Sequence, residues 1–124
     1  MKSLFVPSEE SKELKELGFD IPTFSVYNKH GKLSKKYSIR YRVSGSEYTL
    51  APLYSQVFKW FRKKGYDYEI LRSPILNTLY GKTYYWNIIK SNEEEFTTND
   101  NYDTHEEAEL ACVRELINIV KKTK

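Results

Sequence analysis

THEEAELACVRELINIVKK, residues 104–122, is the stretch that decides the fold of this chain, because it carries a full set of helix signals. Thr104, followed three residues later by Glu107, forms a capping-box pattern at the start. Lysines near the end suit the negative end of the helix dipole. One stripe at helical spacing is apolar and consists of Leu110, Val113, Leu116, Ile117 and Val120. The pattern predicts an amphipathic helix that covers a core.

Two further helices are predicted upstream. The first spans residues 8–17, with Ser8 as N-cap and Gly18 as its end. The second begins with Pro52 at its first position and runs to Lys64, before Gly65. Its apolar stripe contains Leu53, Tyr54, Val57, Phe58, Trp60 and Phe61.

The segments between these helices alternate like strands. From Thr23 the side-chain pattern has a period of two, as in a strand. Residues 28–31 are of the types found in turns, and they predict a hairpin whose second arm covers residues 36–43. Residues 44–46 break that arm. Residues 66–71 and 83–89 read as two more strands, and residues 96–98 as a short one.

The expected fold class is α+β. The order β-β-α-β-β-α predicts one antiparallel sheet of about four strands with two helices packed on one face, plus the short N-terminal helix. The 124 residues suit a single domain over 1–124, with an N-terminal helical segment (1–22) and a sheet-and-helix body (23–124). Aromatic residues make up 15% of the chain, with 11 Tyr, which also favours a sheet.

Composition argues against export and membrane insertion. The first residues lack the apolar run of a signal peptide, and no apolar run approaches the roughly 20 residues that cross a bilayer. The single cysteine, Cys112, is consistent with a reducing compartment. We therefore expect a cytoplasmic protein with no membrane partner.

The chain has few residues for catalysis. His30 lies in the predicted turn, His105 follows the N-cap of the last helix, and Cys112 falls near that helix's apolar stripe. These residues do not form a zinc motif, and the glycines are isolated, so no phosphate loop is present. We expect a non-enzymatic protein with no cofactor, metal or small-molecule ligand; a hydrolase or nuclease would need Glu, Asp and His to converge in one cleft.

Charge is divided along the chain. Residues 29–72 hold eleven Lys or Arg against three acids, whereas residues 91–109 hold eight acids and no Lys or Arg. The acids do not match a calcium-loop spacing, so a solvated acidic flank is the simpler interpretation. The candidate macromolecule-binding residues are Lys35, Lys36, Arg40, Arg42, Lys59, Arg62 and Lys63, with Lys29, Lys32, Tyr27 and Tyr48 expected nearby.

Two kinds of partner fit this charge pattern. A protein partner, or a second copy whose basic surface meets the acidic flank, would use complementary potentials with Tyr and Trp as anchors. Alternatively, the basic residues could neutralise phosphates while aromatic rings stack on the bases of DNA or RNA. A net charge of +3 is mild for a dedicated nucleic-acid binder, so protein contacts are the first hypothesis.

Three stretches resemble a known family: KELGFDIPTFSVYN (15–28), LAPLYSQVFKWFRKKGY (50–66) and YDTHEEAELACVRELINIVK (102–121). Together they are similar to a family of small uncharacterised proteins of Bacteroidetes phages, prophages and genomes. The resemblance covers most of the chain except about residues 73–100. It implies an accessory protein that binds a host or viral macromolecule, and it implies no reaction or site residues.

Overall fold

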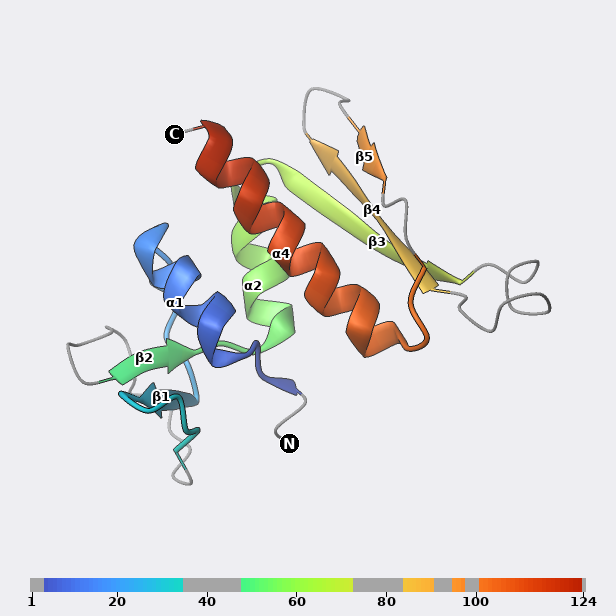
Figure 1. The fold of residues 1–124 in the computed structure, drawn as a ribbon. Helices are drawn as coiled ribbons and strands as arrows, with labels where there is room; N and C mark the ends of the chain where they lie inside the picture. Colours follow the sequence, from blue (N-terminus) through green and yellow to red (C-terminus); the bar gives the residue numbers. More distant parts are fainter. Residues whose placement is uncertain (1–3, 35–47, 73–83, 91–94, 98–100, 124) are drawn as a thin grey trace.

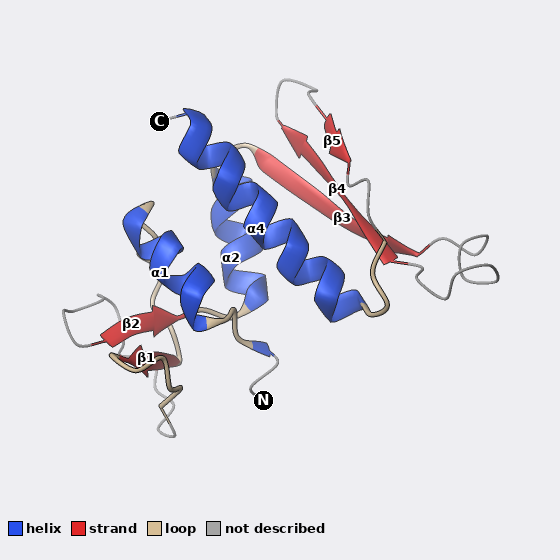
Figure 2. Ribbon diagram, viewed as in Figure 1, coloured by secondary structure: helices blue, strands red, loops and turns tan. Residues whose placement is uncertain are grey.

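The computed structural model describes residues 4–34, 48–72, 84–90, 95–97 and 101–123. They form an α+β fold in which three helices accompany two antiparallel sheets (Figure 1, Figure 2). The elements in chain order are α1 (Ser8–Glu16), β1 (Ser25–Asn28), β2 (Tyr48–Ala51), α2 (Tyr54–Lys63), β3 (Tyr66–Arg72), β4 (Tyr84–Lys90), β5 (Glu95–Thr97) and α4 (His105–Thr123). The sheet orders are β1-β2 and β3-β4-β5.

The predicted arrangement of one sheet of about four strands is wrong, because β1 belongs to a separate two-stranded sheet. Its partner is β2, which lies within the segment between the predicted strand break and the predicted helix, and Val26 pairs with Leu50. Pro52 does not start the helix. Leu53 is still extended (φ −74°, ψ 153°), so α2 begins only at Tyr54.

The turn after β1 is confirmed. Gly31 has φ +77°, a region that favours glycine, and Tyr27 forms a β-bridge with Leu33. The predicted continuation of this hairpin over residues 36–43 lies outside the described residues.

The strands of the second sheet are confirmed near their predicted positions. Ile88 of β4 pairs with Tyr68 on one side and with Phe96 on the other. Trp86 and Ile88 point into the core and are buried, as expected from their alternation. Helices α2 and α4 lie over this face of the sheet (Figure 1).

The start of α2 is fixed by one glutamine. The Leu53 backbone N–H donates to Gln56 Oε1 (2.9 Å), and Gln56 Nε2 donates to the carbonyl of Pro22 (2.8 Å). The first contact satisfies an N–H that the helix cannot bond, and the second ties the helix to the segment before β1. These contacts also help to position Tyr54, which follows Leu53 in the chain.

Helix α4 begins as predicted, because the Glu107 N–H donates to the Thr104 hydroxyl (3.1 Å). Helix α1 packs against α4, and its Leu14 is fully buried in the main core. Its N-cap is Pro7 rather than the predicted Ser8, which is already helical. Within the described ranges, no helix has the length and apolar content needed to cross a bilayer.

Candidate functional site

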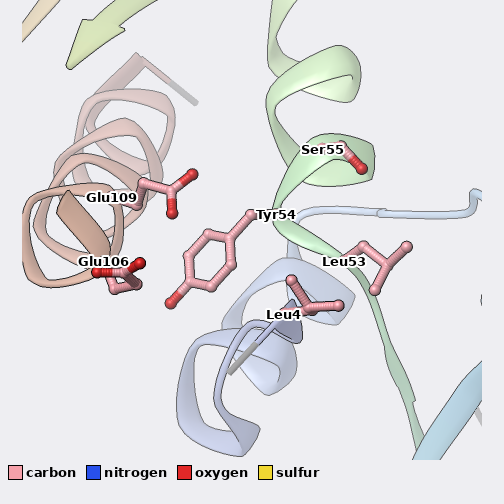
Figure 3. Close-up of a pocket in the computed structure, with 6 residues that line it drawn as sticks. All are labelled: Leu4, Leu53, Tyr54, Ser55, Glu106 and Glu109. Carbon is pink, nitrogen blue, oxygen red and sulfur yellow. The ribbon is translucent and has the colours of Figure 1, made fainter. Parts of the chain in front are cut away.

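A cleft lies where the starts of α2 and α4 meet the N-terminal segment. Its first cavity, of about 410 Å³, is lined by Leu4, Leu53, Tyr54, Ser55, Glu106 and Glu109. In Figure 3 the Tyr54 ring projects from α2 between the two glutamates of α4 on one side and Leu4 with Leu53 on the other. The cavity therefore has an acidic wall, an apolar wall and an aromatic ring between them.

A second cavity, of about 580 Å³, adjoins the first. The two share Tyr54 and Glu106, and the second extends past the start of α1 to the turn after β1. Its other lining residues are Phe5, Pro7, Ser8, Tyr27, Gly31, Glu107 and Leu110. We call the two cavities together the Tyr54 cleft.

Backbone pairing sets the apolar wall of the Tyr54 cleft. Phe5 forms an antiparallel bridge with Leu53, and the Val6 N–H donates to the Pro52 carbonyl (2.9 Å). These contacts hold the N-terminal segment against the start of α2. Leu4, one residue before the bridge, remains 54% exposed.

The acidic wall follows from helical spacing. Glu106 and Glu109 are three residues apart, so both lie on one side of the first turns of α4. His105 Nδ1 lies 3.5 Å from Glu109 Oε1 and its ring contacts Tyr84 edge to face. His105 is exposed, and it also pairs with a residue of the cleft.

Burial dominates the electrostatics of Glu109. Loss of water raises the pKa of its carboxyl above the ordinary value, and the neighbouring Glu106 raises it further. His105 acts in the opposite direction. The charged form of Glu109 is therefore destabilised by burial, and a cation in the cleft would reduce this destabilisation.

Tyr54 is held as a neutral phenol. Burial first, and then the charges of Glu109 and Glu10, raise the pKa of its hydroxyl well above the ordinary value. Within the part of the chain that the structure describes, neither the Tyr54 hydroxyl nor the Glu106 carboxylate has a hydrogen-bond or ion-pair partner. Both groups are thus available to a ligand.

A half-buried ion pair joins α1 to α4. Glu10 of α1 is only 4% exposed, and Arg114 of α4 donates its Nε–H to Glu10 Oε2 (3.0 Å). Beside it, the Tyr27 hydroxyl donates to the Val6 carbonyl (2.7 Å). Burial, with the charge of Glu10, raises the pKa of Tyr27 to about 12.

Three of the sequence-predicted basic residues are described, and none of them lines the Tyr54 cleft. Lys59, Arg62 and Lys63 are exposed on α2, and no ion pair among the described residues involves them. The other four, Lys35, Lys36, Arg40 and Arg42, lie outside the described residues.

The aromatic residues expected beside the basic ones behave differently from each other. Tyr48 is 40% exposed, as an aromatic contact residue would be. Tyr27 is buried, so the expectation that it stacks on a partner is wrong for this residue.

The residues considered for catalysis do not meet in the Tyr54 cleft. Cys112 is fully buried in the core, and burial raises the pKa of its thiol well above the ordinary value. His30 is exposed in the turn after β1. Among the described residues, no group of three His, Cys, Asp or Glu side chains is placed to hold a metal ion.

Sequence reasoning missed the cleft itself. The available signal was Glu106 and Glu109 on the outer side of a helix start, together with a tyrosine at the start of another helix. Nothing in the spacing indicates that these two starts meet, because they are separated by the whole second sheet.

Replacing Glu109 with glutamine should raise stability at neutral pH. A raised folded-state pKa means that the folded protein binds this proton more tightly than the unfolded chain, so ionisation lowers stability as pH rises through that range. Thermal unfolding at pH 7 should show a higher midpoint for Glu109→Gln, and the difference should shrink toward pH 4. Glu69→Gln, on the exposed side of β3, is the control; a Glu109→Gln variant that is less stable than wild type at pH 7 would contradict this account.

No family model, curated protein or solved structure matches the chain.

Proposed function

We propose that this chain is a non-enzymatic binding module that engages a protein partner through the Tyr54 cleft. The observation that carries the proposal is the convergence of a tyrosine hydroxyl and a carboxylate in a cavity that also has apolar walls, where neither group has a hydrogen-bond or ion-pair partner among the described residues. Cavities that combine apolar lining with a few convergent polar groups are typical binding sites.

The shape of the Tyr54 cleft supports a protein partner rather than a small molecule. Its two cavities adjoin along a shared ring, and Leu4 at its edge is 54% exposed. Small-molecule sites usually bury most of the ligand surface. Tyr54 and Leu4 at such an open surface would serve as contact residues for a partner's side chains.

The state of the single thiol supports a role without nucleophilic catalysis. Cysteine reacts as the thiolate, and Cys112 is buried with a raised pKa, so it remains a protonated core side chain.

We place the module in the cytoplasm and in a phage or prophage setting, as composition and the family resemblance imply. A second copy of the chain is an alternative occupant of the cleft.

A second candidate function is sequence-tolerant binding of DNA or RNA. Lys59, Arg62 and Lys63 support it, because they are exposed on one helix and no described carboxylate pairs with them. Cations of this kind bind phosphates and release counterions, which makes affinity fall steeply with salt.

A matched pair of tryptophan variants separates the two functions. Ser55 and Lys59 are exposed on α2 and one turn apart, but only Ser55 lines the Tyr54 cleft. In capture experiments from a lysate of the source organism, Ser55→Trp should lose the partner because its ring fills the cleft mouth, whereas Lys59→Trp should retain it. If Lys59→Trp alone loses the captured material, and nuclease treatment also removes it, the nucleic-acid function replaces the proposed one.

A further inference from the structure

We infer that the Tyr54 cleft accepts an arginine side chain that the protein partner presents between apolar residues. This inference rests on the proposed function and specifies the chemistry of the partner. It follows from three features of the cleft, which are its acidic wall, its ring and its apolar wall.

The acidic wall offers two carboxylates at the spacing of one helical turn. Glu106 is exposed and has no partner in the described part of the chain, and Glu109 is half-buried beside it. A guanidinium has five N–H donors in a planar fork, so it can bond carboxylate oxygens in pairs. A lysine ammonium is a compact, strongly hydrated charge and matches this geometry less well.

The ring and the apolar wall suit the rest of an arginine. Guanidinium groups stack on aromatic faces, and Tyr54 places its ring between the two walls (Figure 3). Leu53 and the exposed Leu4 lie on the far side of the ring, where they can contact the methylene stem and neighbouring apolar residues. The hydroxyl of Tyr54 remains available as a hydrogen-bond donor or acceptor.

The surrounding charges leave the cleft acidic. On α1, Glu10 is already paired with Arg114 of α4, so these two charges offset each other. His105 faces Glu109 and is the other basic group beside it. No ion pair among the described residues involves Glu106 or Glu107, which line the adjoining cavity, so a cation is favoured at this site over an anion or a neutral group.

The test uses short peptides whose central side chain differs only in charge or shape. Acetyl-Leu-Arg-Leu-amide is titrated into the isotopically labelled full chain, and backbone amide shifts are followed by NMR. The same peptide with citrulline, a neutral analogue of nearly the same shape, is the matched control, and a lysine peptide tests the role of planarity. Shifts should cluster at the starts of α2 and α4, with affinity at least about tenfold weaker for citrulline, which corresponds to about 1.4 kcal/mol.

Variants of the protein complete the test. The double variant Glu106→Gln with Glu109→Gln should weaken the affinity for the arginine peptide at least about tenfold. Glu69→Gln, on the exposed side of β3, should leave this affinity unchanged. Should the double variant fold poorly, the affinity of Glu106→Gln alone for the arginine peptide decides the test. This side chain is exposed and has no hydrogen bond or ion pair among the described residues, so its replacement should leave the fold intact. Equal binding of arginine and citrulline peptides, equal binding of arginine and lysine peptides, or shifts that lie outside the cleft would each overturn the inference.

The failure of this inference is distinguishable from failure of the proposed function. If Ser55→Trp abolishes partner capture while the peptides show no preference for arginine, the cleft binds protein through other chemistry and only the arginine assignment falls. If Ser55→Trp retains the partner, the proposed function falls whatever the peptides show.

Discussion

Replacing Phe58 with alanine is expected to lower the free energy of unfolding by about 3–5 kcal/mol, the range typical of large-to-small changes at buried aromatic residues. Phe58 is 1% exposed and belongs to the main core. Its ring stacks on Tyr68 of β3 at a centroid distance of 3.7 Å and an interplanar angle of 10°. Removing the ring leaves a cavity between α2 and the sheet and also removes this stacking, so both losses add. Urea unfolding measures the change.

Two variants serve as controls for Phe58→Ala. Phe58→Leu keeps most of the apolar volume and should cost clearly less. Phe24→Ala removes a ring that is 40% exposed and should cost less than about 1 kcal/mol, as surface changes usually do. If Phe58→Ala costs no more than Phe24→Ala, then α2 does not pack on the sheet as described.

Removing the cation from the Glu10–Arg114 pair should also lower the free energy of unfolding substantially. Arg114→Ala leaves a carboxylate that is only 4% exposed without its partner, and such a loss costs more than the pair itself contributes. Because the Arg114 side chain is 57% exposed, water can replace part of the interaction. We therefore expect a loss of about 1.5–3 kcal/mol, the range for a hydrogen bond to a charged group.

A double-mutant cycle tests whether the loss arises from this pair. With Glu10→Gln already present, Arg114→Ala should cost less than in the wild type, and the difference should be about 1 kcal/mol or more. Lys121→Ala, which removes the exposed partner of Glu13, is the control and should change the unfolding midpoint far less. Strictly additive costs for Glu10→Gln and Arg114→Ala would contradict the described contact.

The sequence predicted those elements whose signals are local. The start of α4, the end of α2 shortly before Gly65 and the alternation of β4 each depend on residues within one or two turns or on a single strand. Core positions followed from the same patterns, so Val57, Phe61 and Leu116 are buried as expected.

Pairing between strands could not be predicted in the same way. β2 covers only four residues, and three of them are buried, so its period of two is hidden. The strand break before it and Pro52 after it suggested a loop and a helix start. Tertiary pairing with β1 decided the conformation of this segment instead.

The Tyr54 cleft was not predictable because its walls come from distant parts of the chain. Leu4, Tyr54 and Glu109 are brought together by the bridge between Phe5 and Leu53 and by the packing of α4 beside α2. The division of charge was visible in the sequence, and it indicated a binding function. It did not indicate that the acidic side includes an aromatic cleft.

The most direct measurement for the central claim is the affinity of the captured partner, once identified, for three forms of the chain. Isothermal titration calorimetry should show that wild type and Lys59→Trp bind with equal dissociation constants, while Ser55→Trp binds at least about tenfold more weakly, or about 1.4 kcal/mol. Equal affinity of the partner for Ser55→Trp and wild type would contradict the assignment of the Tyr54 cleft as the interaction surface.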